Sequence, residues 1–170
     1  MRWPRFTLLM AAFAATPAMA QQPVFDAASV RACFEGATDP AAPCIGEAAT
    51  ACMEASDNGY TTMGMAECTN LETAEWDRLL NIEYRRLRDQ WEALDVEAAG
   101  TSIGAGIDRS DALRDAQQAW IAFRDADCAA RYAQYQDGTI RTTIATGCHL
   151  SHTARRTLEL AAMGRGLDGE

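Results

Sequence analysis

Five residues of unusual character recur on one face of a predicted helix, and this pattern constrains the fold more than any other. Their spacings of four, three, four and four residues place them on the same side of an α-helix. That side carries an indole ring, a guanidinium and a sulfur, where an ordinary amphipathic helix carries aliphatic groups. A buried arginine needs carboxylate or carbonyl partners, so other helices should supply a fixed polar network here. The five residues are Leu113, Gln117, Trp120, Arg124 and Cys128.

All six cysteines lie beyond residue 20, and their even number predicts up to three disulfides in an oxidising compartment. Several complete pairings are possible. We favour the local ones, because each closes a short loop at an expected corner between helices, and each would contribute on the order of 3 kcal/mol to stability. These pairings are Cys33–Cys44, Cys52–Cys68 and Cys128–Cys148.

Residues 1–20 have the composition of a secretory signal peptide. Arg2 and Arg5 form a basic start, an apolar run covers 6–15, and small residues precede a cleavage point near Ala20. The apolar run is too short to span a membrane, and no cysteine at position 21 offers a lipid anchor. The sequence therefore predicts a periplasmic or secreted chain without a membrane anchor.

The charge of the chain limits its partners. Without the two arginines of residues 1–20, thirteen basic residues face twenty-four acidic ones, a formal charge of −11, and every basic residue is arginine. Such a surface argues against nucleic acid and anionic lipid, and it favours a basic partner attracted by electrostatic steering. The alternative interpretation is that the acidic residues only keep the chain soluble.

Hydrophobic periodicity predicts helices and no strand, so the expected fold class is all-α. We expect a disulfide-stapled bundle of about three main helices, with short helices before it. The expected domains are a signal peptide (1–20), a cysteine-containing extension (21–50), a helical domain (51–163) and a frayed tail (164–170). The predicted helices cover 28–34, 44 or 45 to 56, 62–97 with a possible break near Thr69, 110 or 111 to 135, and 140–163.

Three motifs give the chain a family resemblance. They are Asp77-x-x-Leu80-Asn81-x-x-Tyr84, Gln117-x-x-Trp120-x-x-x-Arg124-Asp125-x-x-Cys128, and Arg156-x-x-x-Leu160. Together they resemble the family of the lysozyme inhibitor LprI over roughly residues 52–160. The chain departs from the family pattern after Thr61, where Gly64 replaces the usual glutamate of a capping box.

We interpret these motif residues mainly as structural. Leu80, Tyr84, Trp120 and Leu160 should belong to the core. Arg124 and its neighbour Asp125 point about 100° apart on a helix, so they should not pair with each other. We expect Arg124 to reach Asp77 or Asn81, and Asp125 to reach Arg155 or Arg156.

Candidate catalytic and metal-binding groups are few. The two histidines, His149 and His152, follow Cys148 closely, and Cys148 shares a helical face with His152. A Cys–His–His metal site is conceivable, but the expected Cys128–Cys148 disulfide competes for the sulfur. We therefore predict no enzyme activity, no cofactor and no metal.

The resemblance implies a protein that binds and inhibits lysozyme, a basic muramidase, and the acidic charge agrees with it. The expected partner-binding segment is the turn between Cys128 and Cys148, because a braced loop loses less entropy on binding. The glycine-rich segment 101–108 is the second choice. The alternative function is a periplasmic module that binds another protein or the cell wall without inhibiting lysozyme. The residues expected to bind the partner are Tyr135, Asp137, Gly138 and Thr139.

Overall fold

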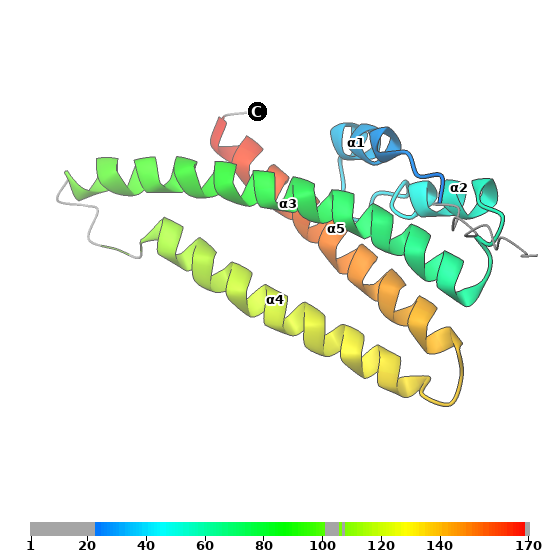
Figure 1. Ribbon diagram of the computed structural model, residues 1–170. Helices are drawn as coiled ribbons and strands as arrows, with labels where there is room; N and C mark the ends of the chain where they lie inside the picture. The colour runs from blue at the N-terminus through cyan, green and yellow to red at the C-terminus, as the bar shows by residue number, and fades with distance from the viewer. Residues whose placement is uncertain (1–22, 101–105, 107, 169–170) are drawn as a thin grey trace, which may run out of the picture.

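The computed structural model describes residues 23–100, 106 and 108–168, and its regular elements there are all helices. This confirms the all-α prediction. The expected signal peptide and most of the glycine-rich connection after residue 100 lie outside the described residues. None of the helices in the described part is long and apolar enough to cross a membrane. The helices are α1 (Ala27–Gly36), α2 (Glu47–Ala55), α3 (Thr62–Ala99), α4 (Arg109–Gln134) and α5 (Ile140–Asp168) (Figure 1).

The longest helix, α3, runs for 38 residues without a break. Thr61 caps it, because its Oγ1 accepts a hydrogen bond from the Gly64 backbone N–H at 3.0 Å. The break considered near Thr69 does not occur. The Thr69 hydroxyl instead donates to the Met65 carbonyl oxygen at 2.7 Å, a bond within the same helix.

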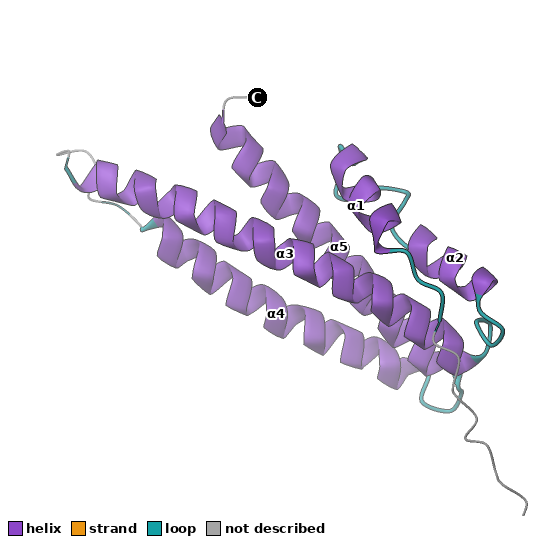
Figure 2. Cartoon of the chain, turned by 45° about the horizontal axis from the view of Figure 1, so that its top comes forward, coloured by secondary structure: helices purple, strands orange, loops and turns teal. Residues whose placement is uncertain are grey.

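Helices α3, α4 and α5 form the main bundle, and α1 and α2 cover the N-terminal half of α3 (Figures 1 and 2). One hydrophobic core lies between α3, α4 and α5, and it contains Leu80, Leu87, Leu113 and Leu160. A second core joins α1 and α2 to α3 and α5. Its largest member is Trp76, which is fully buried and meets the Phe34 ring edge-on at 6.4 Å between ring centroids. The N-terminal extension therefore packs on the bundle.

A buried carboxylate fixes the start of α2. Glu72 of α3 is 1% exposed and accepts hydrogen bonds from the backbone N–H groups of Gly46 and Ala49, both at 2.7 Å. It also accepts one from the Trp76 indole at 3.1 Å. Gly46 adopts a positive φ of 97°, so α2 begins at Glu47 and not at residue 44 or 45. A carboxylate at this position also complements the positive end of the helix dipole.

Two other predicted helix ends are wrong. Helix α4 is capped by Asp108, whose carboxylate accepts from the Asp111 N–H at 2.8 Å, and not by Ser110 or Asp111. Helix α5 continues past Met163 to Asp168. Gly164 lies within this helix, next to the Arg86 guanidinium of α3, and does not end it. A side chain at this position would require the Arg86 guanidinium to shift.

All three expected disulfides form. Cys33–Cys44 links α1 to the loop before α2, Cys52–Cys68 links α2 to α3, and Cys128–Cys148 links α4 to α5. Each joins neighbouring segments of the chain across a corner. The bundle is therefore stapled at successive connections along the chain.

Candidate functional site

The motif residues of α3 and α4 form two matching stripes. On α3, four motif side chains stand at positions i, i+3, i+4 and i+7. On α4, three stand at positions i, i+3 and i+7, so each set shares one helical face. The two faces line a groove with a volume of about 260 Å³, which we call the α3–α4 groove. Its lining residues are Asp77, Leu80, Asn81 and Tyr84 of α3, and Arg114, Gln117, Gln118, Trp120, Ile121 and Arg124 of α4.

The groove has a buried base and an exposed rim. Leu80 and Gln117 are 4% and 6% exposed, whereas Asp77 and Asn81 on the rim are exposed. The rings of Tyr84 and Trp120 are partly buried against the core, and Leu160 of α5 is fully buried there. Leu80 and Leu160 therefore lie in the core, Tyr84 and Trp120 pack at its edge, and Asp77 and Asn81 face solvent at the mouth of the groove.

The expected partners of Arg124 and Asp125 are wrong. These neighbours pair with each other, with the Arg124 Nε donating to Asp125 Oδ1 at 2.9 Å. The arginine side chain is long enough to fold back along the helix surface, which offsets the divergent directions of the two Cα–Cβ bonds. The Arg124 guanidinium also lies 5.0 Å from the Trp120 ring centroid, in a cation–π contact.

The buried arginine of the bundle is Arg156, not Arg124. Arg156 on α5 is 8% exposed, and its Nε donates to Gln117 Oε1 at 3.0 Å. Its Nη1 donates to Glu159 at 3.2 Å. Asp77 and Asn81 stay within α3, where the Asn81 Nδ2 donates to the Asp77 carboxylate at 3.0 Å. One polar link between α4 and α5 thus runs through the carboxamide of Gln117.

Sequence reasoning missed Arg114, Gln118 and Ile121 of the groove. Arg114 and Gln118 are four residues apart, as are Gln117 and Ile121, so helical spacing was the available signal. All three lie outside the motifs that carry the family resemblance. Sequence reasoning also assigned no partner on another helix to Asp127 or Glu72, although each bonds to a residue of another helix.

The turn between α4 and α5 forms the tip of a helical hairpin, and residues 135–139 are all exposed. The backbone N–H of Gly138 donates to the Tyr135 carbonyl oxygen at 3.1 Å, which defines the shape of the turn. Exposed apolar side chains surround it: Tyr132 and Tyr135 are each 40% exposed and Ile140 is 55% exposed. We call Tyr132, Tyr135, Asp137, Gly138, Thr139 and Ile140 the tip surface.

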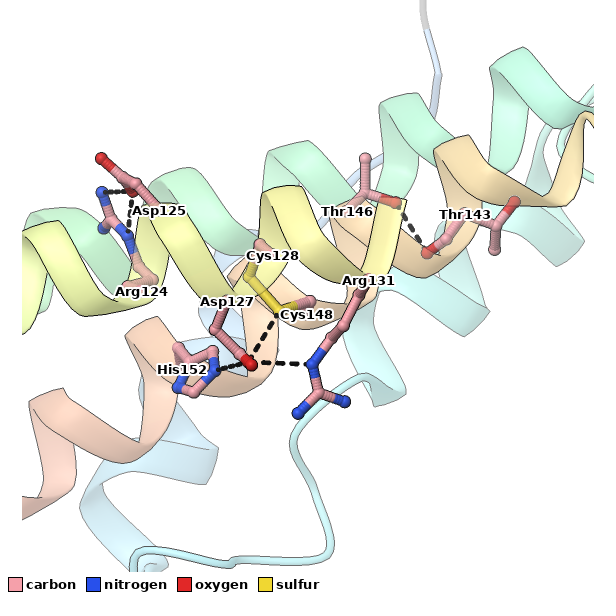
Figure 3. Close-up of a disulfide and its surroundings, with 9 residues drawn as sticks. All are labelled: Arg124, Asp125, Asp127, Cys128, Arg131, Thr143, Thr146, Cys148 and His152. Atoms are coloured by element: carbon pink, nitrogen blue, oxygen red, sulfur yellow. Dashed lines mark hydrogen bonds and ion pairs between the residues drawn. A yellow bond between two sulfur atoms is a disulfide. The ribbon is translucent and has the colours of Figure 1, made fainter. Parts of the chain in front are cut away.

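A polar cluster lies beside the disulfide that braces this tip (Figure 3). The Asp127 Oδ2 lies 2.9 Å from His152 Nε2 and accepts from Arg131 Nε at 2.8 Å. The hydrogen bond with His152, followed by that from Arg131, holds the pKa of Asp127 below its usual value. Burial lowers the pKa of the neighbouring His149, with a further contribution from the positive charge of Arg124.

The same cluster brings four metal-ligand types together. One ligand atom from each of Asp127, Cys128, Cys148 and His152 lies within 4.8 Å of all the others. Both sulfur atoms are shared in the disulfide, however, and the Asp127 oxygen already has two partners. His149 is not a member of this set. With the disulfide formed, the hydrogen bond between Asp127 and His152 adds a polar contact that joins α4 to α5.

Comparisons with known proteins agree with the motifs. The family model "Lysozyme inhibitor LprI" matches residues 52–160. An uncharacterized protein of Rhizobium meliloti (strain 1021) is 31% identical over 98 residues, which cover 58% of this chain and 70% of the relative. No solved structure gives a significant match. The matched segment contains α3, α4, the two motif stripes and most of α5, and the chain therefore belongs to the family of the lysozyme inhibitor LprI.

Proposed function

We propose that this chain is an exported protein that binds and blocks c-type lysozyme. The observation that carries the proposal is the match of the lysozyme-inhibitor family model to residues 52–160. The three disulfides support export, because such bonds persist in oxidising compartments. Periplasmic or secreted location after cleavage near Ala20 is part of the same proposal.

The charge of the chain supports a basic partner. The segment after residue 20 carries a formal charge of −11. Lysozyme of the c-type is a basic protein, so an acidic inhibitor would be steered toward it and would associate faster at low ionic strength. Salt dependence of the association rate is therefore a direct signature of the proposed complex.

The tip surface is the proposed contact. It combines two exposed tyrosines and an exposed isoleucine with the carboxylate of Asp137. Aromatic side chains of this kind are enriched among the residues that dominate binding energy at interfaces. The Cys128–Cys148 disulfide joins α4 to α5 below the turn, so the tip keeps its shape before it meets a partner. A narrow projection with exposed aromatic side chains suits the cleft of an enzyme.

The test is a titration of the oxidised chain, residues 21–170, into c-type lysozyme acting on cell walls, at low and at physiological salt. We expect stoichiometric inhibition that weakens as salt rises. The double variant Tyr135→Ala, Asp137→Asn should weaken inhibition by roughly tenfold or more.

The matched control is Glu92→Gln, which removes one negative charge from exposed residue 92 in the C-terminal part of α3. It should inhibit like the parent chain. Equal loss of inhibition in both variants would show that net charge, and not contact through the tip surface, accounts for the effect. No inhibition at micromolar excess of the parent chain would reject the proposed function.

A further inference from the structure

The α3–α4 groove contains a polar group that the protein leaves unsatisfied. Gln117 is 6% exposed, and its Oε1 accepts from the buried Arg156. Its Nε2 donates to no acceptor in the described part of the chain. Arg156 therefore fixes the carboxamide from the α5 side, while two N–H donors remain at the wall of the groove. The Nε2 atom itself reaches solvent in the groove, so the oxygen of a bound ligand could accept from it there.

Other uncharged polar groups accompany it. The Asn81 Nδ2 is used by the carbonyl and carboxylate oxygens of Asp77, so the Asn81 Oδ1 remains as an acceptor. Among the described residues, no hydrogen bond engages the Tyr84 hydroxyl or the Gln118 carboxamide. The groove thus offers amide donors, an amide acceptor and a phenol.

The charged groups of the groove are already engaged. Arg114 pairs with Asp111 and Asp115, and Arg124 pairs with Asp125. Asp77 is bonded to Asn81. A strongly charged ligand would have to displace these contacts, whereas an uncharged ligand would meet the free amides and the phenol directly. The groove therefore favours a neutral ligand that carries both hydroxyl and amide groups.

Two partly buried aromatic rings complete the site. Tyr84 and Trp120 come from opposite walls, and both pack on the core. The volume of about 260 Å³ is at the small end of ligand sites, which suits one unit of a longer chain more than a whole cofactor. Aromatic rings beside neutral amides suit the mixed apolar and polar faces of a sugar ring.

We propose that the α3–α4 groove binds an N-acetylated amino sugar within a glycan chain. The Gln117 N–H groups would donate to the acetamido carbonyl oxygen, and the Asn81 Oδ1 would accept from the acetamido N–H. The sugar ring would pack against Tyr84 and beside Trp120, whose ring centroid already has the Arg124 guanidinium at 5.0 Å. This site is separate from the tip surface, and it does not depend on lysozyme binding.

The experiment titrates the oxidised chain, residues 21–170, with tetra-N-acetylchitotetraose in the absence of lysozyme. Calorimetry gives the affinity, and ¹⁵N–¹H spectra of side-chain amides and indoles locate the site. We expect binding, with shifts at Gln117 and Trp120. Cellotetraose has the same ring linkage with hydroxyls in place of acetamido groups, and it should bind at least about tenfold more weakly.

The deciding variant is Gln117→Glu, which keeps an oxygen acceptor for Arg156 and removes the N–H donors. It should fold normally and lose about tenfold or more in affinity for the N-acetylated sugar. The matched control is Gln134→Glu, which makes the same charge change at the exposed end of α4 and should bind like the parent chain. Tyr84→Phe tests the contribution of the phenol hydroxyl.

Three outcomes would overturn the inference: no sugar binding at millimolar concentration, equal affinity for both sugars, or equal affinity of the parent chain and Gln117→Glu. Groove resonances that shift with lysozyme but not with sugar would assign the groove to a protein contact. Inhibition of lysozyme is measured separately, so failure of the sugar titration leaves the proposed function standing.

Discussion

At the scale of single residues, Glu72 caps the start of α2, a role that the sequence around it does not indicate. The spacing Thr69-x-x-Glu72 fits a capping box, yet the carboxylate caps a different helix, α2, through two backbone N–H groups. The reason is the tertiary arrangement, which places the start of α2 against the N-terminal part of α3. A carboxylate that is 1% exposed is tolerated there because three donors bond to it.

This role predicts that Glu72→Gln destabilises the protein by about 1–3 kcal/mol, since an amide N–H₂ would face donors that need an acceptor. Urea unfolding with the disulfides intact measures the free energy of unfolding. The control is Glu67→Gln on the exposed side of the same helix, which should change that free energy little. Equal effects of the two substitutions would contradict the capping role.

At the scale of helices, α4 and α5 are joined by the Cys128–Cys148 disulfide and by the Asp127–His152 contact beside it. The pKa of Asp127 is held below its usual value, chiefly by the hydrogen bond with His152. The ionised carboxylate is therefore favoured in the folded state. This contribution to stability is present above the unfolded pKa of about 4, and it is lost as pH falls through the lower folded pKa.

We therefore expect Asp127→Asn to lower the melting temperature at pH 7. The difference from the parent chain should shrink as the pH falls below about 4, because protonation removes the same charge from the parent. Melting curves across this pH range measure the effect, with the exposed Asp57→Asn as control. A difference in melting temperature that stays constant with pH would show that the ionised Asp127 carboxylate does not stabilise the fold.

At the scale of the whole molecule, the N-terminal segment and the family domain share one core. The extension predicted for residues 21–50 contributes Val30 and Cys33 to the cluster that contains Trp76 and Leu79. The Arg31 guanidinium also pairs with Glu75 of α3 at 3.0 Å. The match to the family model begins at residue 52, so Val30, Arg31 and Cys33 lie outside it.

Removal of residues 21–50 should therefore expose Trp76 and its neighbours. We expect the shortened chain to show red-shifted tryptophan fluorescence, a lower unfolding midpoint and aggregation, because a large apolar surface loses its cover. Fluorescence and light scattering test this against the chain of residues 21–170. Native-like emission and an unchanged midpoint would show that the extension is dispensable for the bundle.

The sequence by itself determined the fold class, the approximate helices, the three disulfide pairings and the face of α4 that carries Gln117, Trp120 and Cys128. These features depend on helical periodicity and on short loops, which are local properties of the chain. The family motifs likewise reported the positions that share a face on each helix. The motifs did not indicate which residues of other helices these side chains contact.

Only the tertiary structure decided which groups meet across helices. It paired Arg156 with Gln117 and not with Asp125, and it used Glu72 to cap α2. It also carried α5 past Gly164, which lies beside the Arg86 guanidinium of α3. The physical reason is that periodicity fixes the direction of a side chain around its own helix. The distances to other helices depend on how the helices pack, and no local pattern in this chain encodes them.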